Sequence, residues 1–271
     1  MDEIRMSLSL LINNKVLNYT DSGNGKVVVL LHGYLESIAV WKDFASELSN
    51  SFRVICIDIP GHGQSDTLYN THSMEQLAKC IYQALNTLQI KKCFLIGHSM
   101  GGYLTLMFHK LYPEMLSGFC LFHSHPFADS EEKKLNRLRE TDFVRDGKKN
   151  LIASVNIPNT YATENVPLFA QEIENAKRIV EHTPEQGIIA NIHAMITRPD
   201  LSESLANSSL PFLFIAGKKD NLIDFETIIP KIKLPDNSET LVLLNSGHMG
   251  FIEEKNKSLK YIIQFIESKT N

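Results

Sequence analysis

The stretch Cys93–Gly102 constrains this chain more than any other, because it requires a strand, a tight turn and a helix in quick succession. Residues 93–96 form an unbroken apolar run, which is typical of a strand buried on both faces. Residues 97–101 read Gly-His-Ser-Met-Gly, and from Met100 onward apolar residues recur with the one-sided spacing of a packed helix. Ser99 is therefore predicted at a sharp corner, with its hydroxyl clear of the backbone and the Met100 N–H at the positive end of a helix dipole.

Strand and helix signals alternate in the chain before this corner. They are a strand at 26–31, a helix at 39–48, a strand at 52–57 and a helix at 73–88. A capping box, Ser73-Met74-Glu75-Gln76, opens the second helix, and residues 7–20 precede all of these with two short strands around a turn at Asn13-Asn14. Such alternation predicts an α/β fold with a mostly parallel, doubly wound sheet covered by helices on both faces.

Three motifs follow successive predicted strands. They read His32-Gly33-Tyr34, Asp58-Ile59-Pro60-Gly61-His62-Gly63-Gln64-Ser65 and Gly97-His98-Ser99-Met100-Gly101-Gly102. Together, and in this order, they resemble the α/β-hydrolase superfamily. The resemblance implies that Ser99 is a nucleophile and that the backbone N–H groups of Tyr34 and Met100 form an oxyanion hole. His32 is interpreted as a structural histidine of its loop.

Members of this superfamily place the triad acid, and then the triad histidine, after the serine in the chain. A strand signal at residues 210–216 is followed by Asp220, and another at residues 239–244 is followed by His248. The resemblance assigns His248 as the base and Asp220 as the acid that orients it. Asp224 lies close to Asp220 and is kept as an alternative acid.

Residues 126–207 interrupt the strand signals and read as helices. The resemblance implies a hydrolase core of residues 1–125 and 208–271, with residues 126–207 inserted as a helical cap over the active site. An amphipathic helix is predicted for residues 163–182, and a further helix begins at Thr183-Pro184-Glu185-Gln186.

The cap and the neighbours of the motifs are expected to shape a substrate pocket. The candidate pocket residues are His98, Phe127, Tyr161, Phe169, His193 and Met249. Core packing is the competing interpretation for Tyr161, Phe169 and His193, which lie among apolar residues. The charged run Glu131–Lys134 is interpreted as a solvated helix face.

The residues Ser99, Asp220 and His248 predict a serine hydrolase that cleaves a small carboxylic ester or thioester through an acyl-enzyme. The alternatives are a C–C bond hydrolase or lyase with the same triad, a cofactor-free haloperoxidase activity, and a hydrolase-fold receptor for a small molecule. Neither a cofactor nor a metal is expected. His123 and His125 could suggest a ligand pair, but no third ligand is evident near them.

Charge and targeting signals limit the partners and the compartment. The net charge of -4, without a basic block, disfavours nucleic acid and anionic membranes, so a small-molecule substrate is the expected partner. The oligomeric state is left open. Acidic residues in Met1–Arg5 disfavour a signal peptide, and the four cysteines are expected to be buried thiols, which predicts a cytoplasmic protein.

Overall fold

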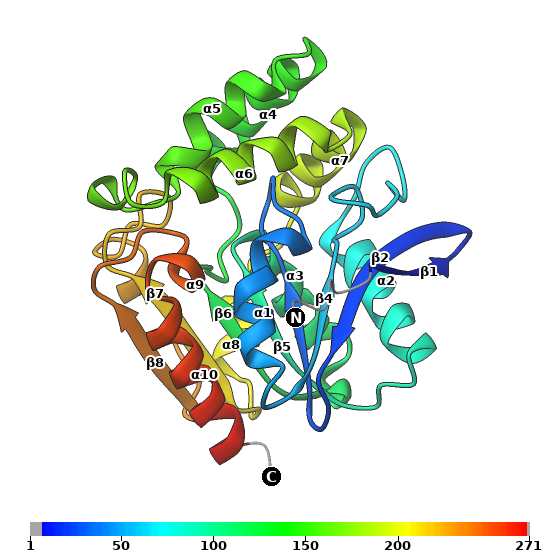
Figure 1. Cartoon of the computed structure of the whole chain (residues 1–271), viewed down its shortest axis with the longest axis vertical. Coiled ribbons are helices and arrows are strands. Elements are labelled where there is room, and N and C mark those ends of the chain that lie inside the picture. The colour runs from blue at the N-terminus through cyan, green and yellow to red at the C-terminus, as the bar shows by residue number, and fades with distance from the viewer. Residues whose placement is uncertain (1–6, 270–271) are drawn as a thin grey trace.

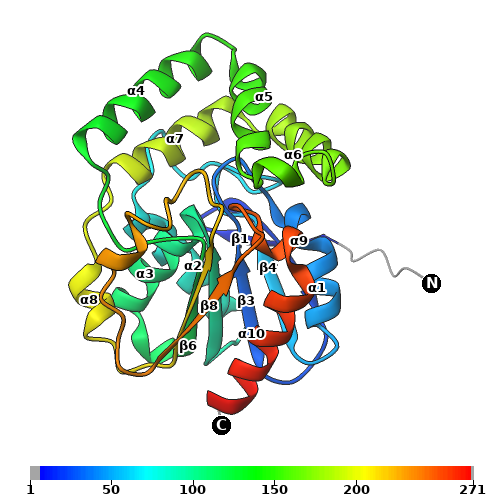
Figure 2. The same cartoon turned by 90° about the vertical axis from the view of Figure 1, so that its left-hand side faces the viewer.

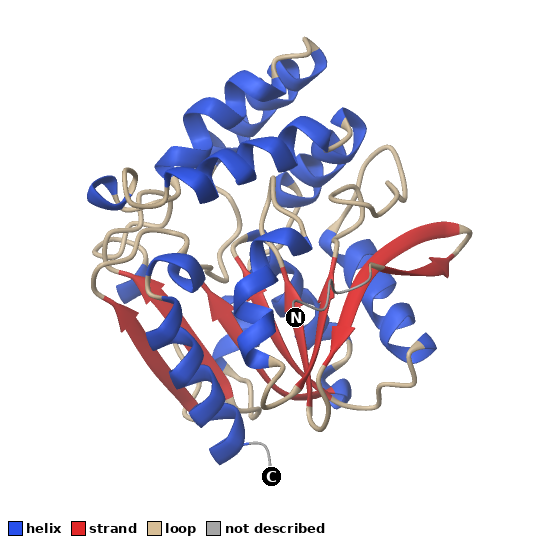
Figure 3. Ribbon diagram, in the orientation of Figure 1, coloured by secondary structure: helices blue, strands red, loops and turns tan. Residues whose placement is uncertain are grey.

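Eight strands pair into one sheet within residues 7–269, the part of the chain that the computed structural model describes (Figures 1 and 3). The sheet order is β1-β2-β4-β3-β5-β6-β7-β8. The strands are β1 (Leu8–Ile12), β2 (Lys15–Ser22), β3 (Val27–Leu31), β4 (Arg53–Ile57), β5 (Cys93–His98), β6 (Leu116–Phe122), β7 (Phe212–Gly217) and β8 (Ser238–Leu243). All pairs from β4 to β8 are parallel, whereas β1 and β2 are antiparallel at one edge, so the predicted mostly parallel sheet is confirmed.

Helices cover both faces of this sheet. On one face α1 (Lys42–Leu48) contacts α10 (Lys255–Lys269), and on the other α2 (Met74–Thr87) contacts α3 (Met100–Leu111) (Figures 1 and 2). Every residue of β5 and β7 is buried, as expected for apolar strands between two helical layers. All four cysteines are buried, as predicted. None of the helices in the described range is long and apolar enough to cross a membrane.

The turn and the capping box predicted in the N-terminal half of the sequence are both present in the structure. Asn13 and Asn14 have φ values of 53° and 62°, and they close the hairpin between β1 and β2 as a primed turn requires. The Ser73 hydroxyl accepts the Gln76 N–H at 3.2 Å, and the Gln76 side chain accepts the Ser73 N–H at 2.9 Å. Met1–Arg5, which informed the expected compartment, lie outside the described residues.

A second layer of helices lies above the carboxyl ends of the strands. Its members are α4 (Glu131–Arg145), α5 (Lys149–Asn159), α6 (Ala170–His182) and α7 (Glu185–Ile196), here called the cap helices (Figures 1 and 2). The remaining helix of the insertion, α8 (Ser202–Ala206), instead packs against α3 beside the sheet. That residues 126–207 form a cap separate from the hydrolase core stays a prediction.

The predicted helix at residues 163–182 begins later than expected. Residues Thr163–Asn165 form a single 3₁₀ turn, and the α-helix starts only at Ala170. Pro167 lies between them and lacks an N–H, and the backbone leaves the helical region at Phe169, which has φ -113° and ψ 29°. Phe169 therefore precedes the helix instead of lying within it.

Two glycines allow α7 to approach the loop that follows β4. A Cβ atom on Gly187 would lie 2.0 Å from the carbonyl oxygen of Gly61, so only hydrogen fits at this position. One turn later, the Asn191 side-chain amide donates to the carbonyl of Pro60 at 2.8 Å. The contact fixes the height of α7 above the sheet.

Gly187→Ala should lower the free energy of unfolding by about 2 kcal/mol, because the added methyl group forces α7 away from Gly61. The same change in an open helix would stabilise by about 1 kcal/mol, so the expected sign is the reverse of helix propensity. Urea unfolding measures the difference. Glu185→Ala, an exposed change in the same helix, should leave stability nearly unchanged, and a Gly187→Ala protein more stable than wild type would contradict the close contact.

Candidate active site

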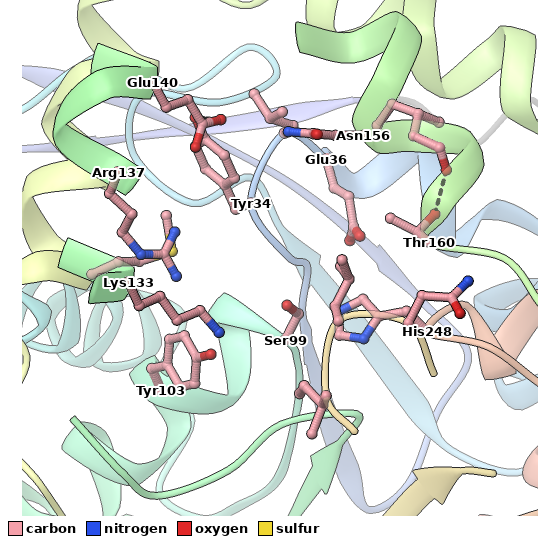
Figure 4. Close-up of a pocket in the computed structure, with 16 residues that line it drawn as sticks. Tyr34, Glu36, Ser99, Tyr103, Lys133, Arg137, Glu140, Asn156, Thr160 and His248 are labelled. Carbon is pink, nitrogen blue, oxygen red and sulfur yellow. Dashed lines mark hydrogen bonds between the residues drawn. The ribbon is translucent and has the colours of Figure 1, made fainter. Parts of the chain in front are cut away.

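Ser99 occupies the turn between β5 and α3, where the sequence predicts it. Its backbone has φ 51° and ψ -114°, a conformation that residues with a side chain rarely adopt. Both flanking glycines are required: a Cβ on Gly97 would lie 2.2 Å from the Gly101 carbonyl oxygen, and one on Gly101 would lie 2.4 Å from that of Leu31. The strained corner presents the Ser99 side chain to a cavity above the sheet (Figure 4).

Asp220 and His248 meet at the carboxyl ends of β7 and β8. His248 Nδ1–H donates to Asp220 Oδ2 at 2.7 Å, while Asp220 Oδ1 accepts the N–H groups of Leu222 and Ile223 at 2.8 and 3.0 Å. Burial alone would raise the pKa of Asp220, but the charge and hydrogen bond of His248 outweigh it, so the pKa lies well below its usual range. The carboxylate therefore stays ionised and fixes one orientation of the His248 ring.

The other side of His248 is left available. Its Nε2 is buried and has no hydrogen-bond partner among the described residues. The backbone is held twice, because the His248 N–H donates to the Thr160 carbonyl at 2.6 Å and the His248 carbonyl accepts from His98 Nε2 at 2.9 Å. Ser99 and His248 line the same cavity of about 310 Å³.

Asp224, the alternative acid, lies apart from this arrangement. It is exposed, and its Oδ1 accepts the Thr227 N–H at 2.7 Å in a local turn. The structure thus brings Asp220, and not Asp224, to His248.

The two residues expected to supply an oxyanion hole, Met100 and Tyr34, lie at the start of α3 and in the loop after β3. Met100 is the first residue of α3, so its N–H has no acceptor within the helix. Tyr34 lines the cavity, and its hydroxyl donates to Glu140 of α4 at 3.0 Å. The next residue, Leu35, has φ 62° and donates its N–H to His62 Nε2 at 3.2 Å, which holds the loop in its turned conformation.

His32 ties the same loop to its neighbour, as interpreted from the sequence. Its Nδ1–H donates to the Gly33 carbonyl at 2.7 Å, and its Nε2 accepts the Ile59 N–H at 2.9 Å. With both ring nitrogens engaged in backbone contacts, His32 has a structural role in the described chain.

Glu36 is a buried acid that the sequence analysis did not single out. Its Oε2 accepts the Gly33 N–H at 2.6 Å and lies 3.1 Å from His98 Nδ1. The opposite ring nitrogen, His98 Nε2, faces the His248 carbonyl. Since both nitrogens of His98 face acceptors, both must carry a proton, and His98 is an imidazolium paired with the Glu36 carboxylate.

Aromatic rings surround His98, so its positive charge depends on the Glu36 carboxylate for stabilisation. The rings of Trp41, Phe122 and Phe251 pack around His98, which is fully buried. Burial lowers the pKa of His98, but the Glu36 carboxylate and the His248 carbonyl raise it more, so the pKa lies above its ordinary value. Burial raises the pKa of Glu36, but the charge and hydrogen bond of His98 more than offset this, and the pKa is lowered.

The expected pocket residues lie away from the cavity that contains Ser99 and His248. His98 is packed beneath His248, and Tyr161, Phe169 and Met249 line a separate cavity of about 540 Å³ beside α1 and α6. Phe127 stacks near His125, and His193 Nδ1 contacts the His72 carbonyl at 3.0 Å. The structure therefore does not place these six residues in one cavity with Ser99 and His248, and their part in substrate binding stays a prediction.

Polar residues of α4 take their place. Lys133, Arg137 and Glu140 line the cavity from above, and Figure 4 shows Lys133 and Arg137 on the side of Ser99 away from His248. The solvated face expected for Glu131–Lys134 therefore holds only in part, because Lys133 turns inward. Other lining residues are Leu35, Glu36, Tyr103, Asn156, Ile157, Thr160, Met195, Asn221, Leu222 and Ile223.

His123 lies beside the acid and completes the one group of possible metal ligands within residues 7–269, with Asp220 and His248. Its Nδ1 accepts the Gly217 N–H at 3.1 Å, so this lone pair is already used. Burial lowers the pKa of His123 to about 4, which keeps the ring neutral. The donor set therefore does not favour a cation, and His125 faces Tyr103 instead.

Glu36→Gln should lower the free energy of unfolding at pH 6 by about 3 kcal/mol, because it leaves a buried imidazolium without its anion. The wild-type pair stabilises the fold fully between the ordinary pKa values of 4.5 and 6.5. This stability is lost as the pH rises through the raised pKa of His98, and as it falls through the lowered pKa of Glu36. The variant should lack the alkaline loss.

Urea unfolding at several pH values, with an NMR titration of the His98 ring, measures both effects. Glu75→Gln makes the same chemical change in the exposed pair with Lys79, and it should leave stability and its pH profile nearly unchanged. An alkaline loss of equal size in wild type and Glu36→Gln would show that His98 is not charged.

The comparisons with known proteins agree with this geometry. Residues 26–255 match the alpha/beta hydrolase fold family. The chain is 25% identical over 265 residues to a 2-hydroxy-6-oxononadienedioate/2-hydroxy-6-oxononatrienedioate hydrolase of Pseudomonas putida, covering 92% of this chain and 91% of that protein. It is 24% identical over 254 residues to a pimeloyl-[acyl-carrier protein] methyl ester esterase of Vibrio vulnificus, covering 92% and 97%.

Solved structures agree at the level of the whole chain. An esterase from Thermogutta terrifontis superposes with a TM-score of 0.92 and 27% identity, covering 98% of this chain and 100% of that one. An enol-lactonase from Burkholderia xenovorans shares the fold, with a TM-score of 0.88 at 20% identity over 96% and 100% of the two chains. The chain therefore belongs to the alpha/beta hydrolase fold family.

Proposed function

We propose that this protein is a serine hydrolase that cleaves a small carboxylic ester or thioester through an acyl-enzyme. One observation carries the proposal. His248 is held by Asp220 with its Nε2 unpartnered and buried, in the same cavity as the Ser99 side chain. A base oriented by an acid, beside a serine on a strained turn, is the arrangement that activates a hydroxyl nucleophile.

The reaction proceeds in two halves. His248 Nε2 takes the Ser99 proton as Ser99 Oγ attacks the substrate carbonyl, and the same proton then passes to the departing alcohol or thiol. In the second half His248 takes a proton from water, the resulting hydroxide attacks the acyl-enzyme, and the proton returns to Ser99 as the acid leaves. Asp220 holds the His248 tautomer and stabilises the imidazolium formed in each half.

The N–H groups of Tyr34 and Met100 are the proposed donors to the tetrahedral oxyanion. Met100 supplies an N–H at the positive end of α3, and Tyr34 supplies one from the loop after β3. A donor of this kind is worth about 3–4 kcal/mol of transition-state stabilisation. Glu36 supports this geometry, because it holds the Gly33 N–H and, through His98, the backbone of His248.

Esterases among the relatives support ester hydrolysis as the first candidate. Esterases stand among both the curated relatives and the solved structures. The Pseudomonas putida relative is named as a hydrolase of 2-hydroxy-6-oxononadienedioate. Hydrolysis of a C–C bond therefore stays the second candidate, and it would use the same three residues. We place the reaction in the cytoplasm, on a small-molecule substrate, as the sequence predicts.

Ser99→Ala should lower kcat/KM for short-chain esters at least about 10⁴-fold, because no other side chain replaces the nucleophile. A fluorophosphonate probe should label wild type and leave Ser99→Ala unlabelled. Mass spectrometry of the labelled peptide locates the adduct. Equal labelling of the two proteins would falsify the assignment of the nucleophile.

Asp220→Asn should lower kcat about 10³- to 10⁴-fold, since an amide stabilises the wrong tautomer of His248. Asp224→Asn removes the same charge four residues later, from an exposed turn, and should keep activity within about twofold of wild type. Steady-state rates on one ester compare the two variants. The assignment fails if Asp224→Asn is the more damaging change.

A further inference from the structure

The side of the cavity opposite His248 is lined by two cations from one helix. Lys133 and Arg137 lie four residues apart on α4, so their side chains share a face. Figure 4 shows both chains reaching into the cavity beside Ser99 and Tyr103. The cap thus brings positive charge to a site where the proposed reaction itself needs no cation.

A single buried carboxylate partly balances this charge. Asp129 pairs with Arg137 Nε at 2.6 Å and with Arg198 Nη1 at 2.9 Å, and its own side chain is fully buried. Arg198 has a structural role, since it also donates to the Phe127 and Met195 carbonyls and lies 3.8 Å from the centre of the Tyr103 ring. Two guanidinium groups therefore share one carboxylate, which leaves a surplus positive charge.

The groups that face the cavity are left without partners. Arg137 uses only Nε, so its two terminal nitrogens have no hydrogen bond or ion pair within the described chain, and neither has Lys133 Nζ. Of the nearby acids, Glu36 is paired with His98, whereas Glu140 accepts the neutral Tyr34 hydroxyl and keeps its charge. Three cations, Lys133, Arg137 and Arg198, therefore face two carboxylates, Asp129 and Glu140, which leaves one positive charge in surplus. Asp129 meanwhile fixes the guanidinium plane of Arg137 before any ligand arrives.

The surplus positive charge also affects the pKa values of neighbouring groups. Burial, together with the charges of Arg198 and Lys133, lowers the pKa of His125 to about 3. Burial raises the pKa of Glu140, while the Tyr34 hydroxyl and the charge of Arg137 oppose this change. The charged groups of α4 and of the loops packed against it therefore leave a cationic surplus toward Ser99.

We propose that Lys133 and Arg137 form a subsite for an ionised carboxylate of the substrate, separate from the carbonyl that Ser99 attacks. The proposal rests on the proposed hydrolase function and names its substrate class: half-esters, or esters of acids that carry a second carboxylate. A planar guanidinium with two free terminal nitrogens fits the two oxygens of a carboxylate, and Lys133 adds a third donor. A dianionic phosphate is disfavoured, because Glu140 borders the same cavity.

Matched esters test the subsite. Monomethyl succinate, glutarate and adipate are each compared with the methyl ester of the corresponding terminal amide, which has nearly the same shape without the charge. Released methanol is measured. For the best chain length, wild type should favour the acid over the amide at least about tenfold in kcat/KM. The preference should shrink as salt is raised.

Variants then locate the charge. Lys133→Gln should reduce the preference for the acid at least about fivefold, and Lys133→Glu should reverse it. Lys134→Gln is the matched control, since Lys134 is the next residue and pairs with Glu131 outside the cavity. It should keep both the rates and the preference of wild type. Arg137→Gln should also lose the preference, with Asp129 still neutralised by Arg198.

Binding is measured separately from turnover, by isothermal titration of glutarate into Ser99→Ala with and without Lys133→Gln. Tight binding that depends on Lys133, without turnover of any ester, would keep the subsite and reject the hydrolase proposal. Turnover of amide-capped and acidic esters at equal rates, with no binding of glutarate, would reject the subsite and keep the hydrolase. An equal loss of preference in Lys133→Gln and Lys134→Gln would also overturn the subsite, because it would indicate a diffuse surface effect.

Discussion

The Glu36–His98 pair is the interaction on which the geometry of the site depends. It connects three loops that follow three different strands: the Gly33 N–H after β3, His98 at the end of β5, and the His248 carbonyl after β8. Each link is a hydrogen bond between buried charged or backbone groups, and aromatic rings surround His98. A buried ion pair is weak evidence for stability in general. Here its consequence is positional, since it sets how far the loop of Tyr34 lies from the loop of His248.

Backbone strain is concentrated around the same point. Leu35, Ser99 and His123 all have positive φ, and each lies just past a strand end that borders the cavity. Such residues cost about 1–3 kcal/mol each unless the surroundings enforce them. The surroundings do so here: His62 holds the Leu35 N–H, the Phe122 carbonyl accepts the Ser99 N–H, and Gly217 donates to the His123 ring. The strained residues at the carboxyl edge of the sheet lower its stability, and the same turns direct side chains toward one cavity.

The core was predictable because a buried parallel strand is a continuous apolar run. The three proposed triad residues came instead from the resemblance to the α/β-hydrolases, whose order of serine, acid and histidine matches Ser99, Asp220 and His248 in the loops after predicted strands. Glu36 could not be found this way, because it lies two residues beyond the His32-Gly33-Tyr34 motif, and its partners Gly33 and His98 are brought to it only by the fold. The start of α6 was misplaced for a local reason: the amphipathic pattern ran through Phe169, where the backbone has φ -113° and ψ 29° and is not helical.

The cap residues that line the cavity were not predicted, for a different reason. Periodicity assumes that a helix turns its apolar face inward. On α4 the reverse holds, because Leu135 and Leu138 are 55% and 50% exposed while Lys133, Arg137 and Glu140 line the cavity. These three lie at positions i, i+4 and i+7, one face of the helix, so the polar stripe itself is the signal. A helix that points such a stripe at a pocket cannot be stabilised there by burial of apolar surface. Arg137 is held instead by Asp129, and Glu140 by the Tyr34 hydroxyl. The helix that supplies the carboxylate subsite therefore also restrains Tyr34, the residue whose N–H is proposed to hold the oxyanion, which couples recognition of a distant charge to the geometry of the reacting carbonyl.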